Sequence, residues 1–156
     1  MREPPVGVAS DPMTPPVDQF LDGNAFRVRI GDQEIAFASV GPITSGTDPA
    51  SAEGRPVDQY APIVLRRALS GSSELFDWRR AIVDGKVDRR DVTISQLSGP
   101  GGTVVVAWRL VRAWPARWSG PSFEATGSSV AHEEIELRFD DLVWLANPAM
   151  DGTGQT

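Results

Sequence analysis

The chain has 156 residues, 40% of them hydrophobic, which suits a single domain that buries a core without needing disulfide or metal cross-links. It contains no cysteine, which excludes disulfides, thiolate metal sites and a cysteine nucleophile. A formal net charge of -6 argues against tight nucleic-acid binding, because that affinity depends largely on Lys and Arg. No stretch is apolar for long enough to predict a signal peptide or a membrane span, so we expect a soluble protein.

Residues 1–23 are rich in proline and have few periodic apolar positions, so we expect an extended or disordered N-terminal arm. From Ala25 onward apolar side chains alternate with arginines, which is the period of a half-buried strand over residues 26–30. Gly31 and Asp32 can turn the chain into a second strand over residues 34–40. Together these strands are predicted to form a hairpin.

Residues 41–56 are rich in Gly, Pro, Ser and Asp and have almost no large apolar side chains. Their own burial cannot hold them in place, which predicts a mobile loop. A short strand over residues 60–65 follows. Pro62 cannot donate to a strand ladder, so it favours an edge or a bulge there.

A helix is predicted over about residues 73–84. Its apolar face is formed by three residues at helical spacing and widened by two others: Leu75, Trp78 and Ile82, with Phe76 and Val83. Ser72 or Ser73 can cap the first turn with a side-chain oxygen. Gly85 can end the helix, because glycine adopts positive φ without a steric clash.

The second half of the chain reads as further strands. Residues 90–97 and 103–114 are predicted to form a long hairpin, and the second of these strands is apolar on both faces, which indicates partial cover on both sides. Residues 129–139 end the sheet, and residues 142–145 extend it or cap the core. The inward-facing set of this last strand is Ala131, Ile135, Leu137 and Phe139.

The fold class is therefore mainly β, with an antiparallel barrel or sandwich of about six strands and one flanking helix. The strands and the helix belong to one domain over residues 24–146. Residues 1–23 form the arm before it, and residues 147–156 form a flexible tail after it.

The residue types needed for catalysis or metal binding do not converge in this pattern. His132 lies on the polar face of a strand, without the parts of a Ser-His-Asp or histidine metal site nearby. Gly99, Gly101 and Gly102 open a strand and not a helix, so they indicate a hairpin turn. We interpret Glu133, Glu134, Glu136, Asp140 and Asp141 as a solvated acidic face in preference to a cation site. No catalytic, cofactor-binding or metal-binding residue is predicted.

Several linked motifs carry a family resemblance. A Leu-Arg-Arg-like element leads to a helix with Leu75 and Trp78, and residues 113–121 form an Ala-Trp-Pro-x-x-Trp-x-Gly-Pro block. The remaining matches are a Gly-Lys and an Arg-Arg element at Gly85, Lys86, Arg89 and Arg90, and a closing strand over residues 130–137. Over about residues 24–145 the chain resembles the tail tube family of contractile phages and phage-tail-like contractile injection systems, related to type VI secretion tube proteins.

That resemblance implies a structural subunit and not an enzyme. It implies hexameric rings stacked into a hollow tube, with sheath and baseplate proteins as partners, and DNA or effector proteins passing through the lumen without specific binding. It implies no cofactor and no membrane partner. Assembly would take place in the bacterial cytoplasm, before the tube joins a phage virion tail or a released injection particle. The predicted core or assembly residues are Leu75, Trp78, Ile82, Trp108, Trp114 and Trp118.

One segment departs from the family pattern, in which a longer charged loop reaches toward the adjacent ring. Here the candidate inter-ring loop is short and rich in Gly and Pro, and is marked by Gly41, Asp48, Glu53 and Pro56. A specialised tube layer, such as an initiator on the baseplate or a terminal adaptor, is therefore the alternative. A carbohydrate- or peptide-binding β-domain that uses exposed tryptophans is a further alternative. The sequence leaves open the choice between a phage and a domesticated injection system.

Overall fold

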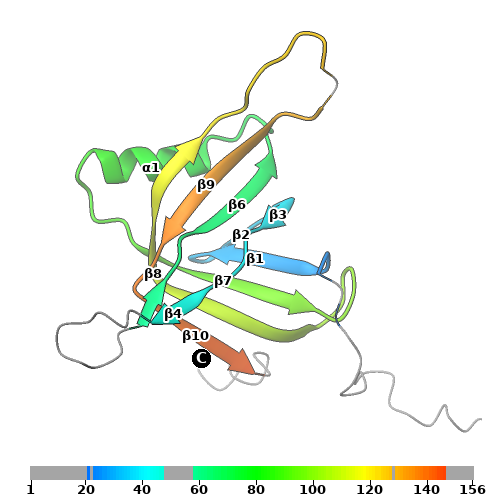
Figure 1. Cartoon of the computed structure of the whole chain (residues 1–156), viewed down its shortest axis with the longest axis vertical. Coiled ribbons are helices and arrows are strands. Elements are labelled where there is room, and N and C mark those ends of the chain that lie inside the picture. Colours follow the sequence, from blue (N-terminus) through cyan, green and yellow to red (C-terminus); the bar gives the residue numbers. More distant parts are fainter. Residues whose placement is uncertain (1–20, 22, 48–57, 128, 147–156) are drawn as a thin grey trace, which may run out of the picture.

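The computed structural model describes residue 21 and residues 23–47, 58–127 and 129–146. The elements in this part of the chain are, in order, β1 (Phe26–Ile30), β2 (Gln33–Ile35), β3 (Ser39–Val40), β4 (Ser45–Thr47), β5 (Asp58–Tyr60), β6 (Ile63–Ala68), α1 (Glu74–Val83), β7 (Arg90–Leu97), β8 (Val104–Ser119), β9 (His132–Arg138) and β10 (Asp141–Ala146). Figure 1 shows the helix lying beside the strands. The described part therefore holds ten strands in place of the six predicted, because several are only two or three residues long.

The main sheet follows the order β2-β1-β7-β8-β9-β6-β3, with β10 paired to β8. Every pairing is antiparallel, and the described strands form an open, sandwich-like arrangement with no closed barrel. One layer contains β2, β1, β7, β10 and the first half of β8, and the other contains β3, β6, β9 and the second half of β8 (Figure 1). The predicted β-rich class with one helix is confirmed.

The long strand β8 connects the two layers through a bend at Arg112. This residue has a φ of 56°, in the left-handed region that non-glycine residues rarely adopt. The Oδ1 atom of Asp91 accepts a hydrogen bond from the Arg112 amide at 3.0 Å. Before the bend, Ala107 and Leu110 point to opposite faces and are both fully buried, so the strand is covered on both sides as predicted.

Helix α1 presents a narrower apolar face than predicted. Leu75 and Trp78 are buried, whereas Phe76 is 41% and Val83 51% exposed, so these last two do not widen the buried stripe. The Trp78 Nε1 donates to the Asp88 carbonyl oxygen at 2.8 Å, which fixes the ring against the segment that follows the helix.

The helix ends as predicted but begins differently. Gly85 has a φ of 89°, and its amide donates to Ile82 while the next amide donates to Ala81, which is a Schellman C-cap. Ser73 occupies the N-cap position without making the expected side-chain cap to the backbone. Its hydroxyl contacts the Asp77 carboxylate at 2.8 Å instead.

The β1–β2 hairpin forms as predicted, with Gly31 in the turn at positive φ. The predicted strand over residues 34–40 is wrong, because the chain leaves β2 after Ile35 and crosses to β6, where β3 pairs with it. The predicted loop over residues 41–56 is also wrong in part, because it contains β4, which pairs with β5. The predicted strand over residues 60–65 is interrupted, with Pro62 lying between β5 and β6. Residues 48–56, the arm over residues 1–20 and the tail over residues 147–156 lie outside the described residues.

The core combines both layers with the helix. Its largest buried side chains come from five strands and α1: Val28, Ile30, Ile63, Leu65, Leu75, Trp78, Val92, Leu110, Ile135 and Leu137. Three of the four residues predicted to face inward on the last strand are buried. The fourth, Ala131, precedes β9 and is half-buried.

Candidate assembly surfaces

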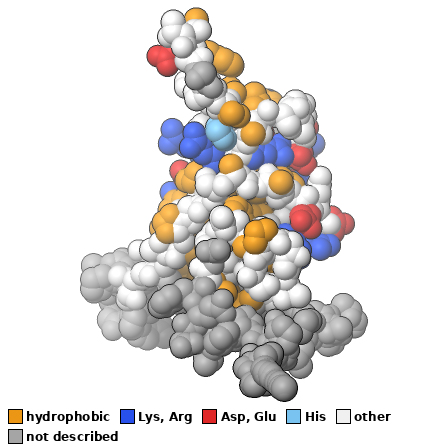
Figure 2. Space-filling view, turned by 90° about the vertical axis from the view of Figure 1, so that its right-hand side faces the viewer, with side chains coloured by type: hydrophobic (Ala, Val, Ile, Leu, Met, Phe, Trp, Pro, Cys, Tyr) orange, Lys and Arg blue, Asp and Glu red, His pale blue; other side chains and the backbone are white. Residues whose placement is uncertain are grey.

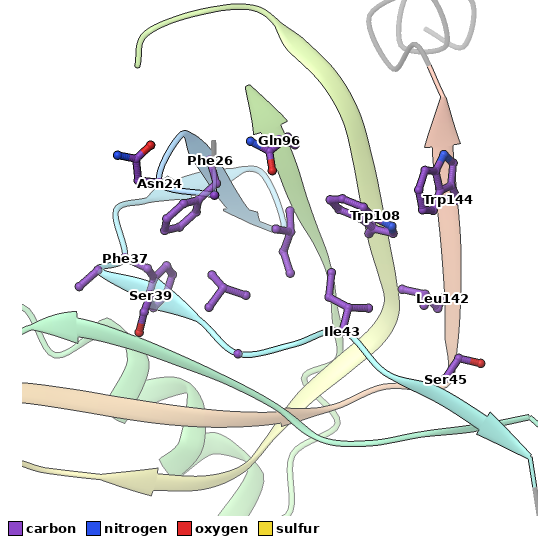
Figure 3. A pocket seen from close by; sticks show the side chains of 15 residues that line it. Asn24, Phe26, Phe37, Ser39, Ile43, Ser45, Gln96, Trp108, Leu142 and Trp144 are labelled. Atoms are coloured by element: carbon purple, nitrogen blue, oxygen red, sulfur yellow. The ribbon is translucent and has the colours of Figure 1, made fainter. Parts of the chain in front are cut away.

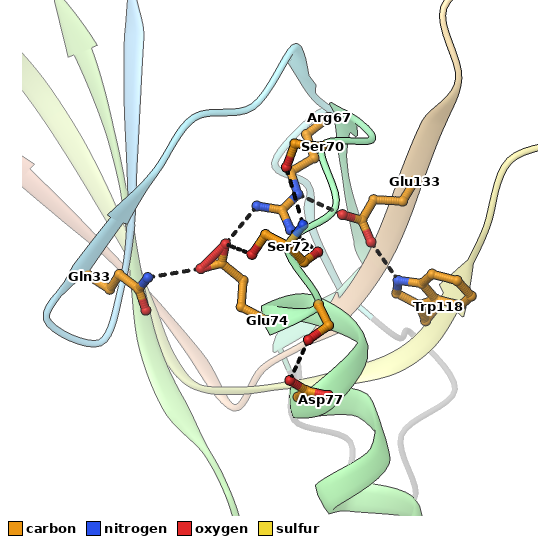
Figure 4. Close-up of polar contacts among 9 residues, drawn as sticks. Gln33, Arg67, Ser70, Ser72, Glu74, Asp77, Trp118 and Glu133 are labelled. Carbon is orange, nitrogen blue, oxygen red and sulfur yellow. Dashed lines mark hydrogen bonds and ion pairs between the residues drawn. The ribbon is translucent and has the colours of Figure 1, made fainter.

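A buried polar network joins the helix start to the β6–β9 pair (Figure 4). The Nε of Arg67 lies 2.7 Å from Oε2 of Glu133, and the Nη1 of Arg67 lies 3.0 Å from Oε1 of Glu74. Trp118 donates its Nε1 hydrogen to the other Glu133 oxygen at 2.8 Å. Both oxygens of the most buried carboxylate are therefore occupied, which is what a charge at 1% exposure requires.

The network shifts the pKa of its members. Burial by itself would lower the pKa of Arg67, but hydrogen bonds to Glu133 and Glu74 hold that pKa above its ordinary value. The pKa of Glu74 is lowered, chiefly by the hydrogen bond from Arg67 and next by the one from Ser72. Glu74 also accepts from Gln33 of β2 at 2.8 Å, so the network reaches across to the other layer.

Glu133 corrects the prediction of a uniformly solvated acidic face. Glu134 and Glu136 of the same strand are half-exposed, and Asp140 and Asp141 are exposed, as expected. Glu133 shares the inward parity of Ile135 and Leu137 and is fully buried. Parity along the strand was the signal that could have placed it inside.

Free strand edges are the first candidate surface for assembly. In the layer that contains β1 and β7, the strands at the two edges are β2 and β10, and among the described residues each pairs with one neighbour. In the other layer, Arg79 of the helix donates to the Pro115 carbonyl of β8 at 3.1 Å. That edge of β8 is therefore covered by α1, whereas β2 and β10 keep backbone groups that a second chain can pair with.

Exposed large apolar side chains are the second candidate surface. On and around the helix they are Leu69, Phe76, Val83 and Val87, with Val87 85% exposed. On the long β8–β9 connection, which projects at the top of Figure 1, Phe123 is 85% and Val130 65% exposed. Figure 2 shows orange side chains on this projection. Groups of this kind mark contact sites more often than isolated apolar residues do.

An open cavity of about 900 Å³ is the third candidate surface. Figure 3 shows Phe26, Phe37, Ile43, Trp108 and Leu142 around it. Trp144 stands at its edge with 65% of its surface exposed, and its ring lies 5.2 Å from that of Trp108 in an edge-to-face pair. The lining is mostly apolar, with a few neutral polar side chains.

The described residues contain no group of three or more His, Asp or Glu side chains that could hold a metal ion. His132 is half-exposed on β9, and its Nδ1 lies 2.8 Å from the Val130 carbonyl oxygen. The single described helix, α1, is too short to cross a membrane.

The structure distributes the six predicted core or assembly residues over four places, of which three are described first. Leu75 and Trp78 are in the core and Ile82 is half-buried beside them, and Trp108 lines the cavity. Trp118 is held by Glu133 and packs edge-to-face on Phe76 with ring centroids 5.0 Å apart.

The last of the predicted tryptophans and the loop residues lie elsewhere. Trp114 lies under the Arg89 guanidinium, with the Cζ atom of Arg89 5.6 Å from the centroid of the Trp114 ring. In the candidate inter-ring loop, Gly41 donates its amide to the Val64 carbonyl at 2.7 Å, so it is fixed to β6. Asp48, Glu53 and Pro56 lie outside the described residues.

Comparison with known proteins gives a consistent picture. The sequence model of the family described as T4-like virus tail tube protein gp19 matches residues 23–143. A chain of the PVC sheath-tube complex in its extended state, from an extracellular contractile injection system, is 31% identical over 83% of this chain and 94% of its own, with a TM-score of 0.68. A chain of the PVC sheath/tube terminator is 30% identical over 84% and 100%, also with a TM-score of 0.68.

More distant structures share the fold alone. Hcp1 from Flavobacterium johnsoniae is 16% identical over 77% of this chain and 94% of its own, with a TM-score of 0.56. The chain matches no curated protein sequence.

Proposed function

Because the chain belongs to the T4-like virus tail tube protein family, we propose that it is a structural subunit of the inner tube of a contractile phage tail or injection system. It forms hexameric rings that stack into a hollow conduit. The observation that carries this is the match over residues 23–143, together with 31% identity to a chain of a sheath-tube complex across nearly the whole of that chain. Its partners are further copies of itself and the sheath and baseplate proteins, and its role is not enzymatic.

The two free edges of one layer, β2 and β10, support a ring that closes by strand pairing between neighbouring subunits. An interface between two different edges generates a ring when its rotation closes, and β2 and β10 are two different edges of one layer. Pairing β10 of each subunit with β2 of the next joins the layers into one continuous inner sheet. This also removes the exposed edges that otherwise promote uncontrolled aggregation.

The charge of the chain supports a conduit without specific binding. With a net charge of -6, a lumen formed from six copies repels polyanions, so that DNA or acidic effectors slide without adhering. Assembly takes place in the bacterial cytoplasm, after which the subunit is part of a virion tail or a released particle.

Cysteine scanning tests the ring contact, since the chain has no native cysteine. One cysteine replaces Glu34 of β2, and a second replaces Leu142, Val143 or Trp144 of β10 in turn, which samples the register. Oxidation should give a ladder of covalent oligomers up to six on a non-reducing gel. Each single variant should stop at dimers, because one thiol can form one bridge.

A matched control places the first cysteine on the edge of the other layer, in the variant Ser39→Cys. A ladder from this β3 pair, with none from the β2 pairs, would show that β10 of one subunit meets β3 of the next in place of β2. The absence of any ladder under conditions where rings are seen by microscopy would refute the pairing of β10 with either edge.

A terminal layer of the same machine is the second candidate. It is favoured by the 30% identity to a chain of a sheath/tube terminator, which this chain covers completely. The two candidates differ in stacking: a tube subunit assembles into long tubes by itself, whereas a terminal layer stops at one or two rings. Measuring the length of assemblies at increasing protein concentration separates them.

A further inference from the structure

A groove of about 500 Å³ follows the free edge of β2. It lies between β2 with the crossing to β3 on one side and the end of β6 with the first turn of α1 on the other, and Figure 4 shows Gln33 and Glu74 on these two sides. Its wall combines the apolar side chains of Ile35 and Phe37 with carboxylate groups such as that of Glu74. A space of this size and composition suits an aromatic side chain that carries one polar hydrogen.

Trp144 is such a side chain, and it lies on the opposite free edge of the same layer, in β10. It is 65% exposed, and its ring is held edge-to-face against that of Trp108. Tryptophan is among the side chains most enriched at the energetic centres of protein interfaces. The other exposed large apolar side chains of the described residues lie outside β2 and β10: Leu21, Leu69, Phe76, Val83, Val87, Phe123 and Val130.

A single row of cross-strand partners connects the two edges. Trp144 pairs with Trp108, Trp108 with Ile94, Ile94 with Val28, and Val28 with Ile35. Residues that stand directly opposite each other in a sheet share a face, and this row faces the core, in which Val28 and Ile94 are buried. Trp144 and Ile35 therefore lie on the same face, at the two ends of the layer.

Pairing β10 of one subunit with β2 of the next continues this face across the junction, because a register that placed the two faces in conflict would turn every side chain over. The residues of β2 on the core side are Ile35 and Gln33, which stand opposite the buried Val28 and Ile30. Both line the groove. Whichever of the two stands next to Trp144, the indole ring is directed toward the groove.

We propose that Trp144 of each subunit inserts into the β2 groove of the next subunit, with its ring against Ile35, Phe37 and Ala38 and its N–H group toward the Glu74 carboxylate. The inference rests on the proposed closure of the ring through β10 and β2, and it names the side chain that fixes the register of that pairing. A shift by one residue would turn Trp144 to the other face and leave the groove unfilled.

Two variants test the contact, one at the inserted side chain and one in the groove. Trp144→Ala removes the ring, and Ala38→Phe fills the groove from an exposed position in its wall. Each should raise the concentration at which half of the chain is in rings by about tenfold or more, as measured by sedimentation velocity. Val87→Ala is the matched control, because it removes an 85% exposed apolar side chain outside the groove and should leave that concentration unchanged.

Mixing the two variants shows whether the contact is made between subunits. In an alternating ring, the Ala38→Phe chain supplies an intact Trp144 to the open groove of the Trp144→Ala chain. At the other junctions the missing ring meets a groove that is already filled. An equimolar mixture should therefore form rings at a concentration well below the one that either variant needs alone. Ala38→Leu, a milder filling variant, should show the same rescue and guards against loss of folding in Ala38→Phe.

The possible failures are distinguishable. Rings from the parent chain, together with mixtures that assemble no better than their components, would overturn the contact and leave ring formation standing. An unchanged half-assembly concentration in Trp144→Ala would also overturn the contact alone. Absence of rings from the parent at every concentration would contradict the proposed tube function, and the contact with it.

Discussion

Arg67 of β6 and Glu133 of β9 stand directly opposite each other in the strand register and form a buried ion pair at 2.7 Å. Trp118 of β8 donates a hydrogen bond to the second oxygen of the Glu133 carboxylate. Glu74 of α1 forms a second ion pair with the Arg67 guanidinium. A single cross-strand pair therefore ties the helix start to three strands. We expect this pair to fix the position of α1 more than to add net stability, because burying two charges offsets much of their attraction.

Removing one partner should be costly. Arg67→Met leaves Glu133 charged and buried without its cation, which should lower the free energy of unfolding by about 3–5 kcal/mol. The double variant Arg67→Met with Glu133→Gln removes the charge and keeps a carbonyl oxygen for Trp118. It should recover part of the loss in urea denaturation. If the double variant were less stable than Arg67→Met, the buried charge would not be the cause of the cost.

Glu74 should make stability depend on pH in the acid range. Its folded-state pKa is lowered, chiefly by the Arg67 hydrogen bond, so its contribution is present above the unfolded pKa of about 4.3 and is lost as pH falls through the lower folded value. Glu74→Gln should therefore be less stable than the parent at pH 7, with the difference shrinking below about pH 4. Urea denaturation across pH 3–7 measures this. A difference that stays constant with pH would contradict the assignment.

The bend at Arg112 allows a test of backbone strain. A non-glycine residue in the left-handed region costs about 1 kcal/mol or more, and Arg112→Gly and Arg112→Ala lose the same exposed ion pair with Asp140. The glycine variant should therefore be more stable than the alanine variant by about 1 kcal/mol. Equal stability of the two in urea would show that the bend carries no such strain.

The position of Trp78 on the buried face of α1 predicts a large loss of stability when its side chain is removed. Trp78→Ala removes a side chain that is 1% exposed and should cost about 3–5 kcal/mol. Trp78→Phe keeps most of the apolar area and loses the hydrogen bond to the Asp88 carbonyl, so it should cost less. A melting temperature of Trp78→Ala equal to that of the parent would contradict the observed packing of α1.

Patterns that depend on near neighbours in the sequence predicted the structure well. The helix agrees to within about a residue at each end, because Leu75 and Trp78 share one face and Gly85 supplies the stop. The β1–β2 hairpin also follows from local alternation and the turn at Gly31. Side chains of the helix that turned out to be exposed, such as Phe76, could not be separated from the core by spacing alone.

Features that depend on distant pairing were missed. Arg67 and Glu133 are 66 residues apart, and each lies at an inward position of its strand, so parity could have flagged both. Their pairing depends on the β6–β9 register, which no local pattern specifies. The crossing from β2 to β3 was missed for the same reason, since residues 34–40 alternate as one strand would.

The candidate inter-ring loop remains a prediction, because residues 48–56 lie outside the described part. Deleting about six residues between positions 48 and 56 should leave rings intact and abolish long tubes, since the strands β4 and β5 that flank it stay paired. A variant with the same length and a Gly/Ser sequence is the matched control, and it separates reach from side-chain chemistry. Long tubes from the deletion variant would show that this loop does not join rings.

The central claim is that this chain is a ring-forming tube subunit, and the most direct measurement is sedimentation velocity of the full chain at increasing concentration combined with negative-stain microscopy. The account predicts six-membered rings that stack into hollow tubes as the concentration rises. Monomers at every concentration, with no rings on the grid, would contradict it.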